Sequence, residues 1–137
     1  MNDKNKYYSR KIIGIYILLL IFHITHIFEE VLARFHVIDE VFGLNFFLLI
    51  NLLLFCLPLG ILYYLVREKI FAFYFAFLYA GIMIINGMAH IIATFLTGSY
   101  FGGYAGGISG TFMVITGFFL ILYLRKKMIS ERNNRNT

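Results

Sequence analysis

The chain is 137 residues long, and 61% of those residues are hydrophobic. Soluble domains contain roughly 45–50% apolar residues, and no water-soluble fold of this length can bury so much apolar surface. The formal net charge of +5 comes from basic residues that flank the apolar stretches, which argues against a nucleic-acid partner. The single cysteine, Cys56, excludes an internal disulfide and a cysteine metal cluster. Composition therefore predicts an integral membrane protein whose partner is the lipid bilayer.

Four apolar stretches are each long enough to cross a bilayer, which takes about 20 residues. They run over about 12–33, 44–66, 70–96 and 105–124. Pro58 lies within the second stretch and predicts a kink there. A cleaved signal peptide is the alternative for the first stretch, but Glu29 and Glu30 directly before the small-residue site disfavour it. With polar tails at 1–11 and 128–137, we predict a single all-α domain, a bundle of four transmembrane helices.

The basic residues predict the orientation of this bundle. All Lys and Arg except Arg34 lie in the N-terminal tail, in the turn at 67–69 or in the C-terminal segment from 125 onwards. With four spans these segments fall on one side, and the positive-inside rule makes that side, with both termini, cytoplasmic. The loop between the first two stretches carries Asp39 and Glu40, in agreement with an outer position.

Ionisable residues gather near the end of the first stretch. Such residues cost about 2.5–3.5 kcal/mol each inside a membrane helix on insertion scales, which makes them functional candidates. His26 and Glu30 are four residues apart, so their side chains lie on one helix face and reach one point. His23 precedes His26 by three residues, and Glu29 follows it by three.

A second polar group lies on the neighbouring stretches. Asn86 and His90 have the same four-residue spacing in the third stretch, and Asn51 lies midway along the second. Counting about 1.5 Å per residue from the helix ends places His26, His90 and Asn51 in one layer, in the outer half of the bilayer. We therefore expect the first three helices to face one another at that level.

These residue types suit a divalent metal, zinc or iron. Imidazole nitrogens and carboxylate oxygens bind both ions, and two histidines with one or two carboxylates leave positions open for water or substrate. The predicted ligands are His26, Glu30 and His90, and Glu29 and Glu30 are the predicted catalytic carboxylates, with Glu29 as general base or fourth ligand. The alternative is structural: Glu30 pairs with His26 or Arg34 and neutralises buried charge.

Other polar groups have weaker patterns. His23 and Asn51 are typical of interhelical hydrogen bonding, although both can also contact a bound ligand. Asn86 lies one turn before His90 and can orient its ring. The glycine-rich stretch over 98–110 predicts either a small-residue packing face or a flexible hairpin over the site.

The run His26-Ile27-Phe28-Glu29-Glu30 resembles the motif that names the HXXEE family of small bacterial integral membrane proteins. Asn51 matches the asparagine of that family's second segment, and Asn86 to His90 matches its Asn-x-x-x-His element. Tyr100-Phe101-Gly102-Gly103 resembles its Tyr-x-Pro-Gly turn, with glycine in place of proline. The resemblance covers about 22–110. It implies a multi-pass protein of the bacterial plasma membrane with a shared polar site that includes Tyr100, and it supplies no substrate.

A second resemblance ranks below the first. Glu29-Glu30-Val31-Leu32-Ala33-Arg34 is similar to the Glu-Glu-x-x-x-Arg motif of the CAAX-protease and bacteriocin-processing family, and Asn86 to His90 falls where that family has its second motif. The last histidine element of that family has no counterpart, because the stretch over 105–124 contains no histidine.

The predicted function is a membrane-embedded protein with a metal-binding His/Glu site, a hydrolase or other enzyme that acts on a lipid or lipid-linked substrate. One alternative is a small proton-coupled transporter. It would work as a homodimer, because one bundle of this size encloses too little space for a transport path across the membrane. Another is a non-catalytic accessory membrane subunit in which the polar cluster fixes helix register. Metal content separates the first class from the other two.

Overall fold

The structure is a computed structural model and describes residues 3–32, 43–97 and 107–135. Its helices are α1 (Asp3–Leu32), α3 (Leu44–Val66), α4 (Ile70–Thr97) and α5 (Gly107–Arg135). All four are long and apolar enough to cross a membrane, and the described ranges contain no strand. The predicted all-α, multi-pass membrane bundle is therefore confirmed.

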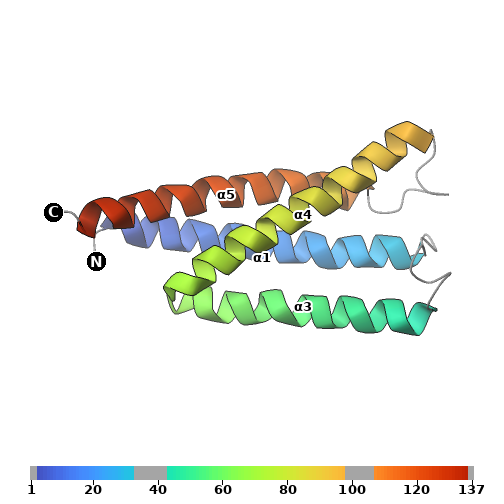
Figure 1. The fold of residues 1–137 in the computed structure, drawn as a ribbon, viewed down its shortest axis with the longest axis horizontal. Coiled ribbons are helices and arrows are strands. Elements are labelled where there is room, and N and C mark those ends of the chain that lie inside the picture. The colour runs from blue at the N-terminus through green and yellow to red at the C-terminus, as the bar shows by residue number, and fades with distance from the viewer. Residues whose placement is uncertain (1–2, 33–42, 98–106, 136–137) are drawn as a thin grey trace.

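The helices extend beyond the apolar stretches at both ends of the chain. α1 already begins at Asp3, and α5 continues past Leu124 to Arg135, so most of the predicted polar tails are helical. Both termini lie at the same end of the bundle (Figure 1). A hydropathy pattern reports the thickness of the apolar layer, and a helix can continue into the polar headgroup region because its backbone hydrogen bonds are internal.

A buried lysine joins the helices at this end. The side chain of Lys127 is only 2% exposed. Its Nζ donates a hydrogen bond to Ser9 Oγ (2.8 Å) and forms an ion pair with Glu131 Oε1 (3.1 Å). The same ammonium group lies 5.1 Å from the centre of the Phe73 ring. Lys127 thus connects α5 with α1 and α4, whereas the sequence predicts only an exposed topology signal at this position.

The buried face of α1 follows a spacing of three and four residues. Ile12, Tyr16, Leu19, His23 and His26 are all buried, and together they form one continuous stripe along the helix. The stripe packs mainly against α5, while α4 crosses the bundle diagonally (Figure 1). The stripe is apolar towards the termini and polar towards the other end. His23 and His26 continue the buried stripe, so their side chains lie inside the bundle and do not face the lipid.

α4 and α5 cross at small residues. A Cβ atom added to Gly87 would overlap the carbonyl oxygen of Gly110, and one added to Gly117 would lie 3.2 Å from the carbonyl oxygen of Ala80. Backbones approach this closely only where side chains are absent or very small. The packing interpretation of the glycine-rich stretch therefore holds at Gly110, and the rest of that stretch, over 98–106, lies outside the described residues.

α3 is the most loosely packed helix. Only 11% of its span is buried inside the bundle, against 33–39% for the other three. It continues without a break through Pro58, whose carbonyl oxygen accepts a hydrogen bond from the hydroxyl of Tyr16 on α1 (3.0 Å). A tight turn with Glu68 in the left-handed region (φ 53°) then leads into α4. α3 is therefore held to the bundle at a few points.

Candidate metal centre

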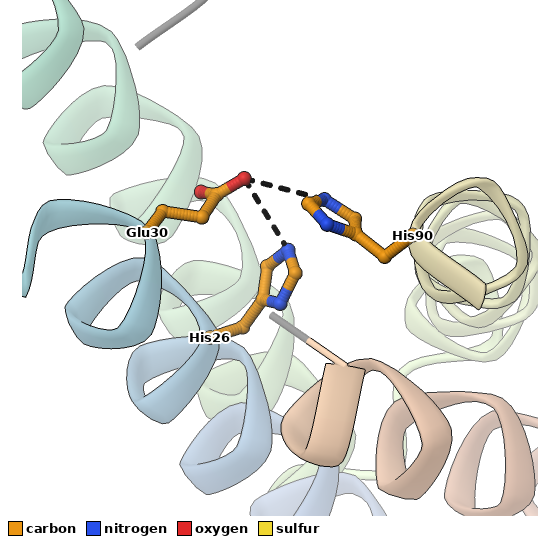
Figure 2. A group of neighbouring side chains, drawn as sticks. All are labelled: His26, Glu30 and His90. Carbon is orange, nitrogen blue, oxygen red and sulfur yellow. Dashed lines mark ion pairs between the residues drawn. The ribbon is translucent and has the colours of Figure 1, made fainter. Parts of the chain in front are cut away.

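The predicted metal ligands come together between α1 and α4. Potential ligand atoms of His26, Glu30 and His90 all lie within 4.8 Å of one another. Figure 2 shows both imidazole rings directed at one oxygen of the Glu30 carboxylate. His26 Nε2 is 3.6 Å and His90 Nε2 is 3.3 Å from Glu30 Oε1. Both histidines are buried, whereas the Glu30 side chain is 13% exposed.

The predicted meeting of His26 on α1 with His90 on α4 is confirmed. The ring centres of His26 and His90 are 4.4 Å apart, with the ring planes perpendicular. Asn51 on α3 and Asn86 on α4 line the cavity that also contacts His26 and Glu30. Counting residues along each helix gave the level of the two histidines, because the rise of an α-helix is constant, whereas the faces that meet come from the packing.

Ser109, in the first turn of α5, adds a contact that the sequence analysis did not predict. Its hydroxyl donates a hydrogen bond to Glu29 Oε2 (2.6 Å) and lies 3.1 Å from His26 Nδ1. A hydroxyl carries one proton, and here that proton is directed to Glu29. The Ser109 oxygen therefore accepts a hydrogen bond from the Nδ1–H of His26. In the sequence, the only sign of this role was that Ser109 is a small polar residue beside Gly110 in an apolar stretch.

This contact determines which nitrogen of His26 is available to a ligand. With the proton on Nδ1, the Nε2 atom of the neutral ring carries a lone pair, and it faces Glu30 Oε1. Two electron-rich atoms that face each other repel unless a positive charge lies between them. Metal-binding histidines are commonly held in this way, with the second ring nitrogen donating to a neighbouring oxygen.

The distances can be compared with those of a hydrogen bond and of two ligands on one metal ion. A hydrogen bond between a protonated imidazole and a carboxylate is about 2.7–2.9 Å long. The observed separations of 3.6 Å and 3.3 Å are both longer. Two ligands of one tetrahedral zinc ion, each about 2.0–2.1 Å from it, lie roughly 3.3–3.4 Å apart. The separation at His90 falls in this range, and the separation at His26 is slightly longer.

The chemistry of the three donors also fits. Two imidazole nitrogens and one carboxylate oxygen make a three-ligand set, which in zinc enzymes leaves a fourth position for water or substrate. The described residues thus form a group that can hold a metal. Glu29 is not a member of this group and reaches it through Ser109. Arg34, the other predicted partner of Glu30, and Tyr100 lie outside the described residues.

His23 has a different partner. Its Nδ1 atom is 2.9 Å from the hydroxyl of Tyr79 on α4, in agreement with the prediction of an interhelical hydrogen bond. The Tyr79 ring in turn lies against that of Tyr16, with ring centres 5.4 Å apart. This second polar group lies one helical turn from the metal ligands, towards the middle of the bundle. Tyr79 was not predicted, because tyrosine in an apolar run is equally typical of packing.

A large cavity opens beside the cluster. Its volume is about 880 Å³, near the upper end of the roughly 300–1,000 Å³ found for small-molecule sites. α1 contributes His23, His26, Ile27 and Glu30 to its wall, and α3 and α4 contribute the remainder. The cavity exists because α3 packs loosely against its neighbours. His26 and Glu30 therefore have direct access to a space that can receive a substrate.

Comparison with known proteins gives no family for the chain. No protein-family model matches it, and neither a curated protein nor a solved structure is significantly similar to it. The case for a function consequently depends on the geometry of the site.

Proposed function

We propose that this protein is a membrane-embedded metal enzyme in which His26, Glu30 and His90 hold a divalent ion, zinc or iron. Its substrate is a lipid or a lipid-linked compound, and the reaction is a hydrolysis. The observation that carries the proposal is the spacing of the two imidazole nitrogens around Glu30 Oε1, 3.6 Å and 3.3 Å. The same residues carry the resemblance to the HXXEE family, and we propose that this cluster is the shared polar site of that family.

Each residue has a separate task in this proposal. A bound ion of this kind polarises a carbonyl or phosphoryl oxygen and acidifies a bound water. Ser109 keeps the proton of His26 on Nδ1 and so leaves Nε2 available. Glu29 is the second carboxylate at the site and the candidate general base, placed by its hydrogen bond to Ser109. Asn51 and Asn86 line the cavity, where their amides can hold polar substrate atoms.

The surroundings favour a substrate from the lipid phase. All four helices are long and apolar enough to cross a membrane, and the cavity wall consists mostly of their apolar side chains. A polar water-soluble substrate would lose hydration in such a wall without compensating hydrogen bonds. A lipid keeps its chain in an apolar environment and brings only its polar end to the metal.

The direct test is the metal content of the detergent-purified protein. We expect one zinc or iron ion per chain in the wild type, and loss of most of it in His90→Ala. His23→Ala is the matched control, because His23 is also a buried histidine but bonds to Tyr79. A wild-type protein that neither contains nor takes up Zn²⁺, Fe²⁺ or Co²⁺ would contradict the proposal. Equal metal loss in His23→Ala and His90→Ala would contradict the ligand assignment.

A proton-coupled transporter is the second candidate, and the contacts of His23 favour it. His23, Tyr79 and Tyr16 form a series of titratable side chains that leads from the metal donors towards the middle of the bundle. Intramembrane residues of this kind often form proton relays. Reconstitution into vesicles separates the two functions. Uptake of a solute driven by a pH gradient, and abolished in His23→Ala, would support transport.

A further inference from the structure

The cavity beside the metal donors changes in character along its length. At one end it contacts the side chains of His26, Glu30, Asn51 and Asn86. Beyond the His23–Tyr79 pair its lining is aliphatic and aromatic, and it reaches Tyr64 and Phe71 beside the turn between α3 and α4. We call this cavity the α3–α4 groove. A ligand that matches it has one polar end and a long apolar remainder.

The length of the α3–α4 groove is informative. Phe71 and Ala89 both line it and both belong to α4, 18 residues apart. At about 1.5 Å per residue, that separation corresponds to about 27 Å along the helix axis. The hydrocarbon core of a bilayer is about 30 Å thick, so one leaflet accounts for about 15 Å. An ordinary acyl chain, which ends near the midplane, would fill only about half of the groove.

The charges near the polar end of the groove restrict the polar group of the ligand. Glu29 and Glu30 lie there, and no Lys or Arg is among the described residues that line the groove. A lipid phosphate would face these carboxylates without a basic partner, and buried charges need such a partner. With a divalent ion bound, the two carboxylates balance its charge, which favours an uncharged oxygen group such as an alcohol or ester.

From these observations we propose that the α3–α4 groove binds a polyprenyl lipid. The single isoprenoid chain extends along the groove towards Tyr64 and Phe71, and the oxygen at the end of the chain lies beside His26 and Glu30. The inference names the substrate class for the function proposed above and rests on that function only for the chemistry at the polar end. Binding of the chain depends on the groove alone.

Two glycines allow a matched test of the chain site. Gly60 lines the groove, and a Cβ atom added there meets no other atom within 4 Å. A side chain added at this position therefore begins in open space on the wall of the groove. A Cβ atom added to Gly81 also meets nothing within 4 Å, but Gly81 does not line the groove. Gly60→Leu and Gly81→Leu are thus the same substitution, inside and outside the proposed site.

The experiment measures retention of labelled undecaprenol by the purified, metal-loaded full chain in mixed micelles. Farnesol, a short isoprenoid alcohol, and dioleoylphosphatidylglycerol serve as competitors. We expect undecaprenol to be retained against either competitor at equal mole fraction. Gly60→Leu should lower retention at least roughly tenfold, because even one methylene group matters in a fitted apolar pocket. Gly81→Leu should retain undecaprenol like the wild type, and both variants should keep their metal.

Two results would overturn the proposal: farnesol competing as well as undecaprenol, or the phospholipid displacing undecaprenol at equal mole fraction. If Gly60→Leu does not fold, Leu57→Trp replaces it, because Leu57 also lines the groove. The same samples distinguish the two proposals. Undecaprenol retained by a wild type that binds no metal would leave the lipid site standing and remove the metal function. A metal-loaded protein that does not retain undecaprenol would remove the lipid site and leave the metal function standing.

Discussion

Gly87 of α4 and Gly110 of α5 are in direct backbone contact, and this contact sets the geometry of the proposed metal centre. A Cβ atom added to Gly87 would overlap the Gly110 carbonyl oxygen and lie 2.8 Å from Val114 Cγ2. His90 follows Gly87 by one helical turn, and Ser109 directly precedes Gly110. The close crossing therefore brings a metal donor from α4 and the hydroxyl that orients His26 to the same point on α1.

Gly87→Ala should accordingly damage both stability and metal binding. The added methyl group collides with backbone, which cannot move aside as a flexible side chain would, and overpacking of this kind costs roughly 1–3 kcal/mol. Thermal unfolding in detergent and metal content are the measurements. Gly81→Ala is the control: a Cβ atom there meets nothing within 4 Å, and the higher helix propensity of alanine should leave stability equal or increased. An unchanged melting temperature in Gly87→Ala would show that the helices can separate here without loss.

Glu30→Gln and His90→Ala should behave as changes to one site. Each should remove most of the bound metal, and the double variant should lose little more, because residues that act as a unit are strongly non-additive. Metal titration of the three proteins measures this. If Glu30 only neutralises a neighbouring charge, Glu30→Gln will alter thermal stability while His90→Ala leaves metal content and stability unchanged.

Asn86→Ala tests a subtler effect on the same site. Asn86 precedes His90 by one turn, and if its amide orients the ring, its loss should weaken metal binding by roughly 10–100-fold without abolishing it. An unchanged metal affinity in Asn86→Ala would show that Asn86 does not orient the His90 ring and only lines the cavity.

Ser109→Ala should weaken metal binding through His26. Without the hydroxyl the Nδ1 proton of His26 loses its acceptor, and the loss of such an acceptor typically lowers metal affinity roughly 10–100-fold. Competition with a chelator of known affinity measures the change. Thr116→Ala is the matched control, a buried hydroxyl farther along α5 that is not bonded to the cluster. A comparable loss in Thr116→Ala would indicate general loosening of α5 instead.

Metal binding should weaken as the pH falls. Both imidazoles and the carboxylate must be unprotonated to bind an ion, so protons compete with the metal at every ligand. The visible spectrum of the Co²⁺-substituted protein, followed during acid titration, reports the loss directly. A spectrum that stays constant throughout the acid titration would contradict the ligand assignment.

Cysteine labelling tests the orientation of the bundle. In a Cys56→Ser background, cysteines at Asn5 and Asn134 should react only from the cytoplasmic side, and one at Asp39 only from outside. The basis is the concentration of Lys and Arg in the segments expected to be cytoplasmic. Reaction of the Asp39 position from the cytoplasm would reverse the proposed topology.

The sequence predicted best those features that depend on a single helix. Apolar length predicted the four spans, and the four-residue spacing of His26 and Glu30 placed both side chains on one face. The role of Ser109 could not be predicted, because it depends on the crossing of α4 and α5, which neither helix encodes alone. The burial of Lys127 was missed for a similar reason: its partner Ser9 is 118 residues away in the chain.

The loose packing of α3 separates two tasks within one small bundle. His26, Glu30 and His90 all belong to α1 and α4, whose relative position is fixed through α5. α3 supplies one wall of the groove and none of the three metal donors. A lateral movement of α3 would thus open the groove sideways to the bilayer for a long lipid, while the three donors stayed in place on α1 and α4.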